Sequence, residues 1–97
     1  MNTMNKQEKP KWFKGAWYDT GGTVRNPFSG EEYELTGAEL SMYNFIKGAE
    51  YTINVSLERS GDFYVEDPTM VKLQKEMIKG LDWFRSENSK AYMVLLD

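Results

Sequence analysis

The stretch Asn26-Pro27-Phe28-Ser29-Gly30-Glu31-Glu32-Tyr33-Glu34-Leu35-Thr36-Gly37-Ala38-Glu39-Leu40 holds a turn, a strand and a helix start within fifteen residues. Pro27 has the backbone φ that an early turn position needs, and Ser29 and Gly30 tolerate the reversal that follows. Residues 23–25 precede this turn, and residues 32–35 follow it with alternating polarity. The pattern predicts a small β-hairpin.

A helix start follows the hairpin directly. Thr36 and Glu39 have the spacing of a capping box, in which each side chain accepts a hydrogen bond from the other residue's backbone N–H. Leu35 and Leu40 are placed to form a hydrophobic staple across this start. Every polar residue of the stretch therefore has a local structural use, and we expect functional residues elsewhere in the chain.

The composition limits what the chain can be. Its 97 residues are enough for one domain, and 40% of them are hydrophobic. No apolar stretch approaches twenty residues, so we expect no membrane span, and the N-terminus lacks the apolar region of a signal peptide. There are no cysteines and hence no disulfides. Together these features predict a cytoplasmic protein.

Positive charge is concentrated at the N-terminus, although the net charge of the chain is −3. The first residues carry Lys6, Lys9, Lys11 and Lys14 against Glu8. Residues 1–11 are polar, and we expect them to form an arm outside a single globular domain of residues 12–97. The overall acidity argues against a dedicated nucleic-acid binder, which is usually basic.

The first helix is predicted to begin near Gly37 and to carry two apolar sides. One stripe contains Ala38, Met42, Phe45, Ile46, Ala49, Ile53 and Leu57. The other side contains Leu40, Tyr43, Tyr51 and Val55. A helix that is apolar on two sides is either sandwiched within the fold or shared with a second chain.

A second hairpin at residues 51–65 is the alternative to this long helix. Residues 51–57 alternate between apolar and polar side chains, and they could pair with residues 63–65. Gly48 would then end a shorter helix at Lys47. We favour the long helix because its apolar stripe passes through Gly48 without a break in phase.

The second helix is predicted to begin at Asp67-Pro68, an N-cap followed by proline at the first helical position. Its inner stripe contains Met70, Leu73, Met77, Leu81 and Phe84, widened by Val71 and Ile78. On the opposite side lie Lys72, Lys75, Lys79 and Trp83. Residues 90–97 form either a third helix, capped by Asn88 or Ser89, or a closing strand. The expected fold is α+β: an N-terminal β-hairpin packed on two main helices, with a short C-terminal closing segment.

Parts of the chain resemble small uncharacterised proteins of marine tailed phages. The resemblance lies in residues 26–30 (NPFSG), 39–46 (ELSMYNFI), 83–85 (WFR) and 91–97 (AYMVLLD), and it extends from about residue 17 to the end. It brings no catalytic motif with it. It implies that the protein acts in the cytoplasm of an infected bacterium.

The sequence contains few of the residues on which enzymes rely. Histidine is absent, which excludes the usual general base and the usual zinc ligand. Carboxylates occur as Glu31-Glu32-Glu34 and as Asp62 with Glu66-Asp67, without EF-hand spacing. We expect no catalytic residue, metal site or cofactor. A carboxylate-based metal site or hydrolase, in which Asp62, Glu66 or Glu32 converge, is the weakest of three hypotheses.

The leading hypothesis is a non-enzymatic interaction protein that self-associates through helical faces, as a dimer. Its six methionines suit adaptable interfaces. The second hypothesis is a nucleic-acid accessory protein, in which the lysines of the arm contact phosphates and nearby aromatics stack on bases. A protein partner other than a second copy is also open. The candidate interaction residues are Trp12, Phe13, Trp17, Tyr18, Leu40, Tyr43, Tyr51, Lys72, Lys79 and Trp83.

Overall fold

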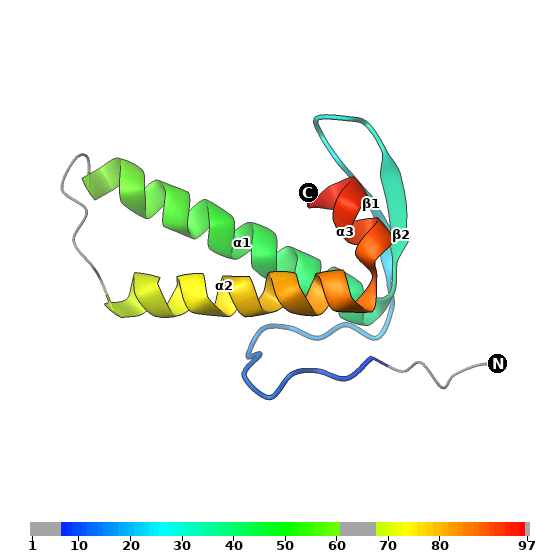
Figure 1. Cartoon of the computed structure of the whole chain (residues 1–97), viewed down its shortest axis with the longest axis horizontal. Coiled ribbons are helices and arrows are strands. Elements are labelled where there is room, and N and C mark those ends of the chain that lie inside the picture. Colours follow the sequence, from blue (N-terminus) through cyan, green and yellow to red (C-terminus); the bar gives the residue numbers. More distant parts are fainter. Residues whose placement is uncertain (1–6, 61–67, 97) are drawn as a thin grey trace.

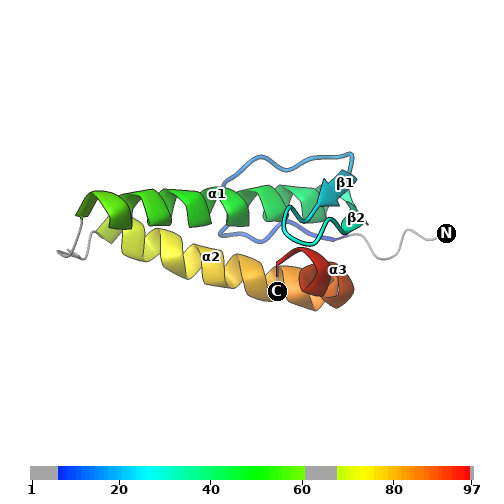
Figure 2. The ribbon, with the colours of Figure 1, turned by 90° about the horizontal axis from the view of Figure 1, so that it is seen from above.

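The computed structural model describes residues 7–60 and 68–96. A β-hairpin, β1 (Gly22–Arg25) and β2 (Glu32–Leu35), is followed by three helices, α1 (Gly37–Ser60), α2 (Pro68–Glu87) and α3 (Ser89–Leu95). Helices α1 and α2 lie side by side, and the hairpin and α3 gather at one end of this pair (Figures 1 and 2). The predicted α+β fold is therefore confirmed.

The hairpin forms where the turn signals predict it. Its strands are antiparallel, with Thr23 opposite Glu34 and Val24 opposite Tyr33. The turn closes with a hydrogen bond of 2.8 Å from the backbone N–H of Gly30 to the carbonyl of Asn26. Gly30 has φ of 80°, in the left-handed region where a side chain would be strained.

The capping box at the start of α1 is also present. The backbone N–H of Glu39 donates to the Thr36 hydroxyl at 3.1 Å, and the N–H of Thr36 donates to the Glu39 carboxylate at 3.0 Å. Leu35 is buried in the core just before this cap, and Leu40 packs against the same core. The local sequence therefore sets both the position and the direction of α1.

Helix α1 runs through Gly48 as a single element, so the alternative of a strand at residues 51–57 is wrong. Residues 63–65, the other half of that alternative hairpin, lie outside the described residues. The helix continues because its apolar stripe keeps facing α2: Ala49 and Ile53 are buried beyond Gly48. Tertiary packing of this stripe outweighs the strand-like alternation of the same residues.

The two long helices approach closely at Gly80, which is buried on α2. A Cβ atom at this position would lie 3.1 Å from the sulfur of Met42 and 3.3 Å from Cγ1 of Ile46. Met42 and Phe84 are fully buried at the centre of the core. A glycine thus lets the backbone of α2 come close to the side chains of α1.

The C-terminal segment is the third helix rather than the closing strand. The Asn88 side chain caps α3 by accepting a hydrogen bond of 3.1 Å from the N–H of Ala91. Ala91 and Leu95 are buried against the rest of the core. At the other end of α2, Pro68 is the first helical residue, whereas the expected cap, Asp67, lies outside the described residues.

A buried carboxylate joins three parts of the chain. Glu39, which is 4% exposed, accepts hydrogen bonds from the side-chain amides of Gln7 at 2.9 Å and Asn88 at 3.2 Å. Gln7 also accepts a hydrogen bond of 2.6 Å from the Thr36 hydroxyl. Gln7, the first described residue of the expected arm, is therefore attached to the domain by its side chain.

Candidate interaction surface

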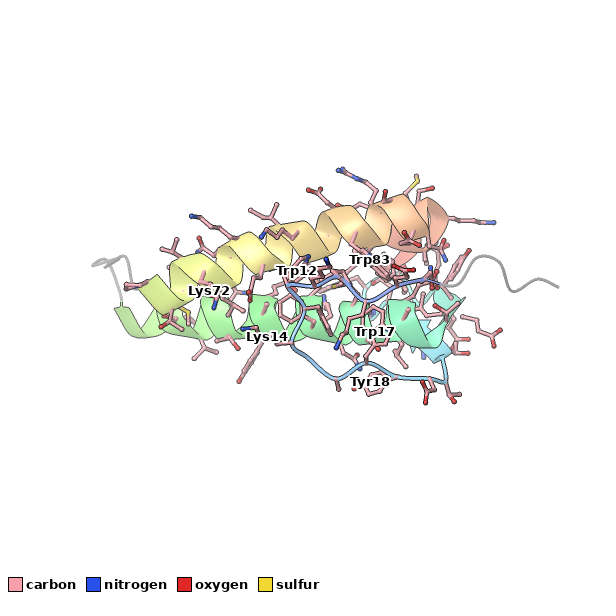
Figure 3. All side chains as sticks on the ribbon, turned by 90° about the horizontal axis from the view of Figure 1, so that it is seen from below. Trp12, Lys14, Trp17, Tyr18, Lys72 and Trp83 are labelled. Carbon is pink, nitrogen blue, oxygen red and sulfur yellow. The ribbon has the colours of Figure 1, made fainter. Side chains whose placement is uncertain are left out.

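The aromatic group of the N-terminal segment packs against both long helices. Its ring centroids lie 5.2 Å apart for Phe13 and Trp17, 5.8 Å for Trp12 and Phe45, and 5.9 Å for Trp17 and Trp83. These spacings and the edge-on or tilted geometries are typical of packed aromatic clusters. We call the side of the α1–α2 pair that residues 7–20 cover the sealed face (Figure 3).

Packing leaves little of these rings free. Phe13 is buried at 3% exposure, and Trp12 and Trp17 are half-buried. Tyr18 is 39% exposed, and its hydroxyl accepts a weak hydrogen bond from Asn44 at 3.4 Å. Of the four aromatic residues that the sequence singles out here, only Tyr18 presents much of its side chain to solvent.

Trp83 is not the isolated outer aromatic that its position among lysines suggests. It is half-buried, and its ring packs edge-on against that of Trp17 in the N-terminal segment. The lysines of the same helix, Lys72, Lys75 and Lys79, are exposed. Sequence periodicity identified the side of α2 on which Trp83 lies, but it could not show that a distant segment covers that side.

The second apolar side of α1 divides into two parts. Leu40 is half-buried and Tyr43 is buried, at 9% exposure, and both pack in the core next to the hairpin and α3. Tyr51, further along the helix, is 71% exposed. Packing within the chain therefore accounts for the first part of this side and leaves Tyr51 uncovered.

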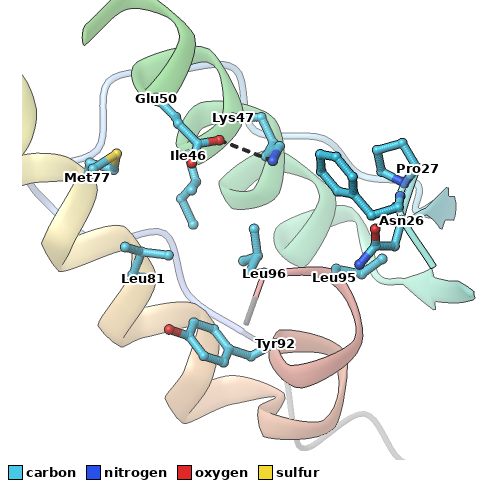
Figure 4. A pocket seen from close by; sticks show the side chains of 11 residues that line it. Asn26, Pro27, Ile46, Lys47, Glu50, Met77, Leu81, Tyr92, Leu95 and Leu96 are labelled. Carbon is cyan, nitrogen blue, oxygen red and sulfur yellow. Dashed lines mark hydrogen bonds and ion pairs between the residues drawn. The ribbon is translucent and has the colours of Figure 1, made fainter. Parts of the chain in front are cut away.

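A hollow of about 290 Å³ lies between α1, α2, α3 and the hairpin turn (Figure 4). Most of the residues that line it are apolar, although polar atoms make up about half of the exposed lining: Asn26, Pro27, Phe28, Ile46, Lys47, Glu50, Met77, Leu81, Tyr92, Leu95 and Leu96. Lys47 and Glu50 form an ion pair of 3.1 Å in this lining, with side chains that are 43% and 53% exposed. Arg85 lies near one edge, 5.8 Å from the centre of the Tyr92 ring.

The hollow and the sealed face lie on opposite flanks of the helix pair. On α2, Leu81 lines the hollow, whereas Trp83 contacts Trp17 on the sealed face. These two residues are two positions apart, so their side chains point about 200° apart around the helix axis. On α1, Lys47 lines the hollow and Phe45 contacts Trp12 with the same spacing. We call the flank that contains the hollow the hollow face.

The carboxylates named in the sequence do not form a cluster in the described part of the chain. Glu31, Glu32 and Glu34 are exposed, and no group of three or more acidic, histidine or cysteine residues within 7–60 and 68–96 could hold a metal ion. Asp62, Glu66 and Asp67 lie outside the described residues. The third hypothesis therefore gains no support from the geometry.

The hollow face contains residues that sequence reasoning did not select, chiefly Phe28, Met77, Leu81, Tyr92 and Leu96. The available signal was Phe28, an aromatic residue in a turn, where small and polar residues are usual. Met77 and Leu81 were assigned to the inner stripe of α2, and the sequence could not show that part of this stripe stays uncovered.

Comparison with known proteins gave no relative: no protein-family model, curated protein or solved structure matches the chain. Among the described residues, no helix is both long and apolar enough to cross a membrane.

Proposed function

We propose that this protein is a non-enzymatic interaction protein that forms a dimer through its hollow face. The observation that carries the proposal is the difference between the two flanks of the α1–α2 pair. Aromatic residues of the N-terminal segment pack over the sealed face, whereas the opposite flank has an open hollow between α1, α2, α3 and the hairpin turn, in which polar and apolar atoms are exposed about equally. A concave site lined by several apolar side chains together with a few polar groups is typical of a binding surface.

The exposed apolar residues extend beyond the hollow itself. Ile78 is 55% exposed and lies three residues before Leu81, so both occupy the same side of α2. Leu57 of α1 is 40% exposed. A partner on this flank would bury these side chains together with the hollow, at about 25 cal/mol for each Å² of apolar surface removed from water.

The charges around the hollow favour a second copy of the chain as the partner. Lys47 is paired with Glu50, and Arg85 with Asp82, both at 3.1 Å. A face with both signs of charge can meet its own copy across a two-fold axis without net repulsion. These exposed pairs contribute little to stability on their own, about 0–1 kcal/mol each, and suit the polar rim of an interface.

A pair of charge substitutions tests the proposal. Ile78→Glu places a carboxylate on the hollow face, and we expect it to shift the dimer towards monomer in sedimentation velocity. Ala16→Glu adds the same charge at an exposed position of the N-terminal segment and should leave the equilibrium unchanged. Equal effects of the two variants, or no effect of either on a stable dimer, would contradict assignment to the hollow face.

The dimer would act in the cytoplasm, and in that of an infected bacterium if the resemblance to phage proteins reflects its origin. A nucleic-acid accessory role is the second candidate, because Lys14 and Lys72 are presented on the same side of the molecule (Figure 3). The packed rings beside them favour contacts to phosphates over stacking on bases.

A gel shift with single-stranded DNA tests this second role. At low salt we expect a shift that raised salt abolishes, and that the double variant Lys14→Glu/Lys72→Glu loses. Ile78→Glu serves as the control because it adds negative charge on the other flank. Absence of a shift at low salt would remove the nucleic-acid hypothesis.

A further inference from the structure

We infer that the hollow of each copy receives Phe28 of the other copy, so that the two chains exchange the same aromatic anchor. The inference rests on the proposed dimer and adds its register. It places a functional residue inside the turn that otherwise looks purely structural.

Phe28 is the most exposed of the large hydrophobic residues in the described part of the chain, at 95%. Its position in the turn does not require an aromatic side chain, because turns are built from glycine, proline, asparagine, aspartate and serine. Single exposed apolar residues are common on proteins. Phe28 differs from such residues because it stands at the edge of a hollow that could receive the same side chain of a second copy.

The turn that presents Phe28 is held in a defined conformation. The Asn26 side-chain oxygen accepts hydrogen bonds from the backbone N–H groups of Phe28 at 2.8 Å and Ser29 at 3.3 Å. The Asn26 side-chain amide donates to the carbonyl of Val94 in α3 at 2.9 Å. These bonds fix the turn against α3 and so fix Phe28 relative to the hollow. Because the backbone of the turn is already fixed, binding through Phe28 would cost little further loss of backbone freedom.

The hollow is large enough for a phenyl ring. Its volume is about 290 Å³, whereas an apolar cavity of about 150 Å³ in another protein binds benzene. Ile46, Met77 and Leu81 line it with apolar groups from the two long helices, and Leu95 and Leu96 do so from the C-terminal end. Phe28 of the same chain lines the hollow, yet 95% of its surface remains exposed, so its ring leaves the space open.

Two-fold symmetry makes the exchange reciprocal. In such an interface residue i of one copy meets residue j of the other, and residue j of the first meets residue i of the second. Phe28 and the hollow lie beside each other on one face, so one rotation can seat both rings. The two Phe28 rings would then approach each other near the axis, where buried aromatic anchors commonly dominate binding.

Truncation of the anchor measures its contribution. In the full chain, Phe28→Ala should raise the dimer dissociation constant about 100-fold, since each of the two anchors contributes about tenfold or more. Tyr18→Ala, which removes a partly exposed aromatic side chain from the sealed face, should change the constant by less than about threefold. Circular dichroism of both variants checks that the helices remain folded.

Cross-linking tests the register, and the absence of native cysteines makes it specific. A chain with Ser29→Cys, at the exposed position next to the intact Phe28, is mixed with a differently tagged chain with Met77→Cys and treated with a short bis-maleimide. We expect a cross-linked pair of the two chains, and much less product when Ala16→Cys replaces Met77→Cys. A wild-type dimer whose affinity survives Phe28→Ala, with no enrichment of this cross-link, would overturn the inference while leaving the proposed dimer intact. A wild-type monomer would remove both.

Discussion

Glu39 is the residue on which the N-terminal segment, α1 and the cap of α3 converge. Its carboxylate accepts hydrogen bonds from the backbone of Thr36 and from the side chains of Gln7 and Asn88. Buried carboxylates are costly unless such donors satisfy them. No buried side-chain nitrogen or oxygen in the described residues lacks a partner, so Glu39 sits in a fully satisfied network.

Removal of this carboxylate should therefore destabilise the fold. We expect Glu39→Ala to lower the free energy of unfolding by about 2–4 kcal/mol, because three donors lose a charged acceptor. Glu34→Ala, at an exposed position of β2, should change it by less than about 0.5 kcal/mol. Urea denaturation followed by circular dichroism measures both. A loss below about 1 kcal/mol for Glu39→Ala would show that the network contributes little.

Sequence reasoning found half of this network. Thr36 and Glu39 are three residues apart, so a local rule predicts their contact. Gln7 and Asn88 are separated from Glu39 by 32 and 49 residues, and no local pattern links them. The same limit applies to Trp83, whose ring packs against that of Trp17 at the other end of the chain.

At the scale of elements, the two glycines in the middle of α1 and α2 have different roles. Gly48 lies on the surface of α1, where an added Cβ would have no neighbour within 4 Å, whereas Gly80 lies against Met42 and Ile46. The sequence predicted correctly that α1 passes through Gly48, because the apolar stripe keeps its phase. It could not show that Gly80 lies in close contact with the side chains of α1.

A matched pair of alanine substitutions separates these roles. Gly48→Ala should raise the free energy of unfolding by about 0.5–1 kcal/mol, because alanine favours the helix. Gly80→Ala gains the same propensity but crowds the helix contact. We expect it to be less stable than Gly48→Ala by about 1–3 kcal/mol, the usual cost of overpacking. Thermal and urea unfolding measure the difference, and equal stabilisation would show that the helix contact adapts freely.

The hairpin shows which structural features can be predicted from residues that are close in sequence. Local signals predicted its strands, its turn and the capping box that follows, because each depends on residues close in sequence. They did not predict that the turn is fixed to α3 through Asn26 and Val94, or that Phe28 stands beside a hollow between three helices. The stretch that decides the fold thus also contains the residue that we place at the centre of the interface.

At the scale of the whole molecule, the N-terminal segment packs over one flank of the helix pair, and the hollow lies on the other. This segment is rich in aromatics, a feature visible in the sequence, but which flank it covers depends on the tertiary fold. The two apolar sides predicted for α1 pointed to a second chain. Leu40 and Tyr43, on one of those sides, are packed against the core of the same chain. The hollow and the exposed Phe28 are the features that still favour self-association.

The oligomeric state of the wild-type chain tests this account most directly. Sedimentation equilibrium over a concentration series from low to high micromolar should give a mass that rises from monomer to dimer and then stays constant. A closed two-fold interface predicts this plateau, because it leaves no free binding face. A mass that remains that of the monomer throughout the high micromolar range would contradict the account.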